Sequence, residues 1–169
     1  KGDDNKYYEQ VGKSDKEITE EIAFDLPNGW SWCRLKDICS IFTGATFKKE
    51  ETVTTKEGVR ILRGGNISPF ELRIKDDDIF LTKDKVKEDI ILKENDILTP
   101  AVTSLENIGK MVRVNSDMPN TTVGGFVFII RLYLKNQWLS KYILYLLSSP
   151  FMIDFMKSIT NKSGQAFYN

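Results

Sequence analysis

Residues 121–147, TTVGGFVFIIRLYLKNQWLSKYILYLL, change from a strand-like to a helix-like pattern near Lys135. The first half is the most apolar strand-like stretch of the chain, rich in Val, Ile and Phe, and Gly124-Gly125 predicts a bulge or a sharp bend within it. In the second half, helical spacing gathers one apolar face: Trp138, Leu139, Tyr142, Ile143, Leu146 and Leu147. The stretch therefore predicts a strand followed by an amphipathic helix.

A second helix follows directly. Ser149 suits an N-cap and Pro150 the first helical position, so we expect a helix that continues to about Ile159. At this spacing the aromatic and Met side chains of both helices are expected to belong to the core rather than to a cofactor site. The two helices predict a C-terminal helical hairpin.

The upstream sequence adds short elements. We expect a helical turn at 35–38, a strand at 39–43 that ends at Gly44, a strand at 59–64, and a short helix capped by Thr82. Cys33 and Cys39 lie among apolar neighbours, which predicts buried thiols in a reducing cytosol. The fold class predicted is α+β, with a mixed or antiparallel sheet, short helices and the C-terminal helical hairpin.

The 169 residues suffice for one domain with a sizeable core. Residues 1–22 are polar and without periodicity, and they predict a linker or arm; residues 23–169 are expected to form a single domain. We find no apolar run of the length a membrane span needs and no apolar signal region, and without an initiator Met the chain is interpreted as a piece of a longer protein.

The residue inventory argues against several kinds of chemistry. The chain has no His, which excludes a Ser–His–Asp triad, a Cys–His pair and the usual zinc ligands within it. A phosphate loop would need Gly at Ser104 and Ser or Thr at Met111. The acidic run 76–78 would point to alternate faces of a strand, so a solvated turn is expected rather than a metal site. The sequence predicts neither a catalytic centre nor a metal site.

The stretch DILTPAVTSLENIGKMVRV (96–114) holds a polar loop, about residues 99–110, that is longer than a hairpin needs. It and two other loops carry side chains suited to DNA, because Arg, Lys, Asn and hydroxyl groups donate to phosphates and base edges. The DNA-binding candidates are Lys48, Lys49, Arg63, Asn66, Arg73, Thr103, Ser104, Asn107 and Lys110. Composition alone leaves open that they are ordinary surface residues of a binding module.

Three segments together resemble the DNA specificity subunits of type I restriction–modification systems. They are DLPNGWSWCRLKDICSIFTG (25–44), VRILRGGNIS (59–68) and LKENDILTPAVTSLENIGKMVRV (92–114), and the acidic lead-in before Pro27 is also typical. Asn95 stands where the family pattern has Gly, and both residues tolerate a positive φ. The chain ends before any heptad pattern of the coiled coil that separates two such domains.

The resemblance implies one target recognition domain that reads half of a bipartite site in double-stranded DNA. It implies that the chain itself is non-catalytic, holds no cofactor or metal, and acts in the cytoplasm in host defence. Methyltransferase and restriction subunits would be its partners, and these would carry S-adenosylmethionine, ATP and Mg. By the same resemblance, loop 99–110 faces DNA, Ile108 anchors its base and Gly109 lets the chain turn back.

Two other interpretations stay open. The chain could be the specificity domain of a fused restriction–methyltransferase polypeptide, whose catalytic part lies outside these residues. It could also be a non-catalytic protein-interaction module, which would present an exposed apolar patch instead of a basic concave face.

Overall fold

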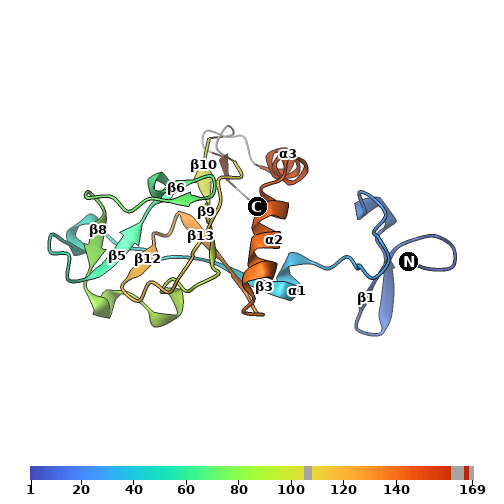
Figure 1. Ribbon diagram of the computed structural model, residues 1–169, viewed down its shortest axis with the longest axis horizontal. Helices are drawn as coiled ribbons and strands as arrows, with labels where there is room; N and C mark the ends of the chain where they lie inside the picture. Colours follow the sequence, from blue (N-terminus) through green and yellow to red (C-terminus); the bar gives the residue numbers. More distant parts are fainter. Residues whose placement is uncertain (105–107, 161–165, 168–169) are drawn as a thin grey trace. The chain divides into compact units, whose positions relative to one another are not determined.

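The computed structural model describes residues 1–104, 108–160 and 166–167 (Figure 1). The chain divides into two compact units, Lys1–Arg34 and Leu35–Asn169. We describe each unit by itself. Because the second unit contains both large sheets and all the candidate residues, it is the one that bears on function.

The first unit contains a hairpin of β1 (Tyr8–Val11) and β2 (Ser14–Glu17). Its turn includes Gly12, whose φ of +66° favours glycine. Arg34 forms ion pairs with Glu9 and Glu21, at 2.7 and 2.6 Å. The sequence predicted a linker here and gave no sign of the hairpin, because both of its strands are polar and largely exposed. The unit ends at Arg34, whereas the sequence suggested a boundary at residue 22.

The first sheet of the second unit is antiparallel throughout, in the order β11-β9-β13-β3. Its strands are β3 (Cys39–Thr43), β9 (Ile97–Pro100), β11 (Val112–Arg113) and β13 (Val127–Leu132). The central strands are buried almost completely, in keeping with their Ile, Leu and Val content. Cys39 is buried as predicted, but Cys33, in the first unit, is exposed, which corrects the prediction of two buried thiols.

The second sheet is mixed, in the order β12-β5-β8-β4. Its strands are β4 (Thr52–Val53), β5 (Val59–Leu62), β8 (Ile79–Leu81) and β12 (Thr121–Val123), with β12 parallel to β5. Two small pairs complete the β-structure: β6 (Ile67–Ser68) with β7 (Glu71–Leu72), and β10 (Val102–Thr103) with β14 (Ala166–Phe167). The predicted α+β class is confirmed, with several sheets in place of one.

The chain passes from the second sheet to the first between β12 and β13 (Figure 1). Gly124 and Gly125 lie in this connection. The Gly124 amide donates to Leu62 O at 2.8 Å, and the Val127 amide donates to Gly124 O at 3.0 Å. The predicted sharp bend is therefore present, and it separates β12 from β13. A buried cluster that includes Leu62, Leu98 and Ile129 joins the two sheets into one core.

The helices are α1 (Leu35–Ile38), α2 (Gln137–Leu147) and α3 (Pro150–Ile159). Ser149 caps α3 and Pro150 begins it, as predicted; the Asn136 side chain caps α2 by accepting hydrogen bonds from two backbone amides. Single 3-10 turns occupy Thr19–Glu21, Lys49–Glu51, Gly64–Asn66, Lys83–Lys85 and Glu88–Ile90. The helix predicted after Thr82 is thus one 3-10 turn.

The buried face of α2 differs from the predicted one. Ser140, Ile143, Leu144 and Leu147 are buried, whereas Trp138 is 68% exposed. Tyr142 is also exposed, so the prediction that the aromatic residues Trp138 and Tyr142 belong to the core is wrong, and Leu146 of the predicted apolar face is exposed as well. The physical reason is a hydrogen bond of Ser140, whose hydroxyl donates to Asn95 O at 2.9 Å. This bond allows polar Ser140 to lie at the centre of the buried face of α2.

Among the described residues, no helix is both long and apolar enough to cross a membrane. Within the same residues, no group of three or more His, Cys, Asp or Glu side chains could hold a metal ion.

Candidate nucleic-acid interface

Four segments converge where the two sheets meet, and we call them the junction edge: residues 45–46, 63–65, 100–101 and 124–126. The Ala101 amide donates to Phe126 O at 2.9 Å, and the Ala45 amide donates to Val123 O at 2.8 Å. A Cβ at Gly64 would lie 3.6 Å from Pro100 Cβ, so these two segments also touch. The three candidate loops of the sequence therefore begin at or beside one edge of the fold.

Asn66 lies beneath this edge and is only 1% exposed. Its Oδ1 accepts a 2.8 Å hydrogen bond from the Arg63 amide. Its Nδ2 donates to Arg73 O at 2.9 Å and to Asp78 Oδ1 at 2.6 Å. The side-chain amide of Asn66 makes its hydrogen bonds inside the fold and is not available to a base edge. Asn66 is therefore withdrawn from the DNA-binding candidates.

Asp78 is the buried partner of this asparagine, with a side chain that is 0% exposed. Its Oδ2 accepts from Arg60 Nη1 at 2.8 Å and from the Lys75 amide at 2.9 Å. Burial by itself would raise the pKa of Asp78, but these hydrogen bonds and that from Asn66 outweigh it and hold the pKa below its usual value. The predicted solvated turn at 76–78 therefore holds for Asp76 and Asp77 but is wrong for Asp78.

Arg63 and Arg73 are exposed at the two ends of the segment that Asn66 ties together. Arg63 Nη2 donates to Asp77 O at 3.2 Å, and Arg73 donates through Nε and Nη2 to Glu71 Oε2 at 2.9 and 2.6 Å. Arg63 Nη2 also lies 3.5 Å from Asp77 Oδ2. Exposed ion pairs of this kind contribute little to stability, because water screens them. A phosphate or a guanine edge could therefore replace the carboxylate of Asp77 or Glu71 at low cost.

Lys48 and Lys49 are exposed and follow Thr46 of the junction edge by two and three residues. The Lys48 amide donates to Glu51 Oε2 at 2.7 Å and starts the 3-10 turn Lys49–Glu51. The start of this loop packs closely against Gly125. A Cβ added at Gly125 would lie only 2.9 Å from Thr46 Oγ1.

Loop 99–110 is anchored at its far end. Ile108 and Gly109 are buried, and Gly109 has a φ of +86°, as expected for a residue that turns the chain back. Lys110 is half-buried and Ser104 is exposed. Thr103 lies in β10, while Asn107 lies outside the described residues.

Phe126 is a candidate that sequence reasoning missed. It is 75% exposed, more than the other large apolar residues of the described chain that are exposed. Its backbone is held by the bond from Ala101, and it immediately precedes the central strand β13. The signal available in the sequence was a large apolar residue directly after Gly124-Gly125.

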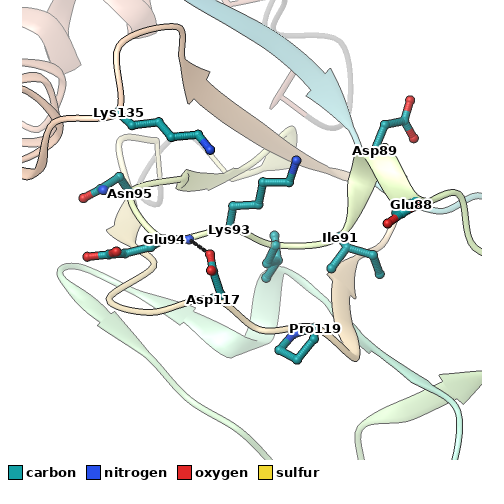
Figure 2. A pocket seen from close by; sticks show the side chains of 10 residues that line it. Glu88, Asp89, Ile91, Lys93, Glu94, Asn95, Asp117, Pro119 and Lys135 are labelled. Carbon is teal, nitrogen blue, oxygen red and sulfur yellow. Dashed lines mark hydrogen bonds between the residues drawn. The ribbon is translucent and has the colours of Figure 1, made fainter.

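A separate groove of about 940 Å³ lies along residues 88–95, with Asp117, Pro119 and Lys135 on its other walls (Figure 2). Figure 2 shows a hydrogen bond between two of its lining residues, in which the Glu94 amide donates to Asp117 Oδ1 at 2.8 Å. Four carboxylates and two ammonium groups line the groove. This charge balance disfavours a polyanion, so the junction edge remains the candidate interface.

Comparison with solved structures defines the fold first. The fold resembles that of the HsdS subunit from Thermoanaerobacter tengcongensis, with a TM-score of 0.51 at 19% identity over 78% of this chain and 33% of that one. A chain from the structural study of complex assembly and conformational transition of the type I R-M system gives a TM-score of 0.53 at 20% identity, over 77% of this chain and 30% of that one. The fold is therefore that of type I specificity subunits.

Sequence comparison finds a curated relative among the same subunits. The specificity subunit of the type I restriction enzyme EcoAI from Escherichia coli is 36% identical over 104 residues, which make up 59% of this chain and 17% of that protein. No protein-family model matches the chain. Over about the length of one target recognition domain, the chain is therefore similar in sequence and in fold to type I restriction–modification specificity (HsdS) subunits. It spans less than two thirds of each of these relatives.

Proposed function

We propose that this chain is a sequence-specific DNA recognition module that reads one half of a bipartite site. The observation that carries the proposal is its 36% identity to a type I specificity subunit. The junction edge supports it, because exposed Arg63 belongs to it and two candidate loops begin beside it, the one with Lys48 and Lys49 and the one that ends at Lys110. Exposed Arg73 ends the segment that begins at Arg63.

The chemistry of this edge fits a duplex. Lys and Arg neutralise phosphates and position the protein, while guanidinium and hydroxyl groups donate to base edges in the major groove. Phe126 adds an apolar surface of the kind that contacts a thymine methyl group. We therefore assign Lys48, Lys49 and Lys110 to phosphates, and Arg63, Arg73, Thr103, Ser104 and Asn107 to bases or phosphates.

In this proposal the chain performs no chemistry and holds no cofactor. Methyltransferase subunits would bind S-adenosylmethionine and methylate adenine, and a restriction subunit would use ATP and Mg to cleave DNA. The module would direct both activities in the cytoplasm by supplying the sequence preference of the complex. The same reasoning applies if the module is fused to a methyltransferase in one polypeptide.

A protein-interaction role is the second candidate, and the helices favour it. Trp138, Tyr145, Phe151 and Phe155 are exposed on α2 and α3. Exposed aromatic residues of this density are typical of protein contacts. This role is compatible with DNA recognition if the two use different faces.

Selection of DNA by the complete complex tests the proposal. The full specificity polypeptide is purified with its methyltransferase subunit and mixed with a library of random duplexes, and the bound DNA is sequenced. The proposal predicts enrichment of one bipartite motif. A Lys49→Ala/Lys110→Ala variant should bind less DNA but keep the motif. Binding without any enriched motif would contradict the proposal and leave the interaction role.

A further inference from the structure

The segment from Arg63 to Arg73 begins and ends on one buried side chain. The Arg63 amide and the Arg73 carbonyl both bond to the amide group of Asn66, at 2.8 and 2.9 Å. This segment contains Gly64, Gly65 and a hairpin whose strands are two residues long. Strands of two residues stabilise a hairpin only weakly. The hydrogen bonds of the Asn66 side chain therefore fix the conformation of the segment.

Asp78 fixes Asn66 in turn. Its carboxylate accepts from the Asn66 amide, the Lys75 amide and the Arg60 guanidinium, at 2.6, 2.9 and 2.8 Å. Arg60 also lies over the Phe80 ring, at 4.8 Å from its centroid. The chain of contacts therefore runs from β5 and β8, through Asp78 and Asn66, to both ends of the segment.

The tip of the same segment is held in an unusual conformation. Phe70 has a φ of +63°, which is uncommon for a bulky residue. Its amide donates to Met111 O at 2.8 Å, next to the candidate Lys110. Such a conformation persists where the surroundings impose it. The segment is thus tied at its start, its tip and its end.

We propose that Asn66 and Asp78 are positioning residues for DNA recognition: they hold Arg63 and Arg73 in one arrangement while touching no DNA themselves. The inference rests on the proposed function. Pre-organised donors lose less conformational freedom on binding than free side chains do. Loss of the hydrogen bonds made by Asn66 and Asp78 therefore lowers the preference for target over non-target DNA, whereas the non-specific attraction to phosphates persists.

The chain offers a matched control in Asp96. Its side chain is 1% exposed and accepts from Arg131 and from the Lys93 amide. Like Asp78, it is a buried carboxylate that accepts from one arginine and one backbone amide, whereas Asp78 accepts from the Asn66 side chain as well. It precedes β9, at the end opposite Pro100 of the junction edge. A change at Asp96 therefore affects stability without reaching the Arg63–Arg73 segment.

The experiment compares Asp78→Asn with Asp96→Asn in the full complex of specificity and methyltransferase subunits. Thermal unfolding and the affinities for target and non-target duplexes are measured, the affinities well below both melting temperatures. Both variants should melt earlier. Asp78→Asn should lower the ratio of target to non-target affinity about tenfold, the size of one lost base contact, and Asp96→Asn should leave it within about twofold.

Asn66→Ser provides a second, independent test, because it removes both ties and leaves the Asp78–Arg60 pair intact. It should lower the affinity ratio as Asp78→Asn does. Equal ratios for Asp78→Asn and Asp96→Asn, or an unchanged ratio in Asn66→Ser, would overturn the inference. A wild-type complex that shows no preference for a target would instead overturn the proposed function itself.

Discussion

Arg131 and Asp96 form a bidentate ion pair in the first sheet, with Arg131 Nε 2.8 Å from Asp96 Oδ1 and Arg131 Nη2 2.6 Å from Asp96 Oδ2. The same guanidinium donates to Asp89 O and Ile91 O, at 2.6 and 2.8 Å. One side chain thus joins β13 to the start of β9 and to the segment that lines the groove of Figure 2.

Arg131→Met should destabilise the fold strongly, because it leaves the Asp96 carboxylate buried without its arginine. We expect a loss of about 3 kcal/mol in the free energy of unfolding, at the lower end for broken buried pairs, measured by denaturant titration. Arg73→Met is the control, since the Arg73–Glu71 pair is exposed, water screens it, and its loss should change the free energy of unfolding much less. Equal losses would contradict this account of the core.

Asp78 should contribute to acid unfolding. Its pKa is lowered in the folded state, so its stabilising effect is complete above the usual value of 3.8 and is lost as pH falls through the lower folded pKa. The stability difference between wild type and Asp78→Asn should therefore shrink as pH falls below about 4. Chemical unfolding between pH 6 and pH 3 measures it. If the stability difference between wild type and Asp78→Asn stays constant across this range, protonation of Asp78 does not contribute to acid unfolding.

Gly109→Ala should destabilise the base of the polar loop by two effects. The residue has a φ of +86°, and an added Cβ would lie 2.6 Å from Ile153 Cγ1 of α3. We expect a loss of about 1–3 kcal/mol, measured by thermal unfolding. Gly12→Ala separates the effects, because Gly12 has a φ of +66° with nothing within 4 Å, and its loss should be smaller. Partial recovery in Gly109→Ala/Ile153→Ala would confirm the contact with α3.

Lys49→Ala and Lys110→Ala should weaken DNA binding for target and non-target duplexes alike. Each lost phosphate contact is expected to reduce the slope of log affinity against log salt by about 1. Titrations of the full complex at several salt concentrations give this slope. Lys141→Ala is the control, because Lys141 lies on α2 over the Trp138 ring, at 4.7 Å. A change of slope for Lys141 alone would move the interface from the junction edge to the helices.

The sequence predicted those parts of the fold that local chemistry controls. The turn at 35–38, the strand at 39–43 and the Ser149-Pro150 helix start are confirmed, because caps, prolines and β-branched runs act on near neighbours. The division into two large sheets was not predicted, because it depends on which distant strands pair on either side of Gly124. The buried face of α2 was wrong because the partner of Ser140 is a carbonyl 45 residues away.

In the candidate site, too, the features that depend on distant residues could not be predicted from the sequence. Arg63 and Arg73 are exposed as a surface interpretation requires, but nothing in the sequence shows that Asn66 and Asp78 are buried against each other. Long-range hydrogen bonds of this kind leave no periodic pattern. Phe126 was missed although its sequence signal was local, a large apolar residue directly after the predicted bend at Gly124-Gly125.

The central claim is that this chain supplies DNA sequence preference to a modifying complex. The most direct measurement is methylome sequencing of the source organism with and without the gene. The account predicts that one bipartite adenine-methylated motif disappears on deletion and returns with the wild-type gene. An unchanged set of methylated motifs would contradict it.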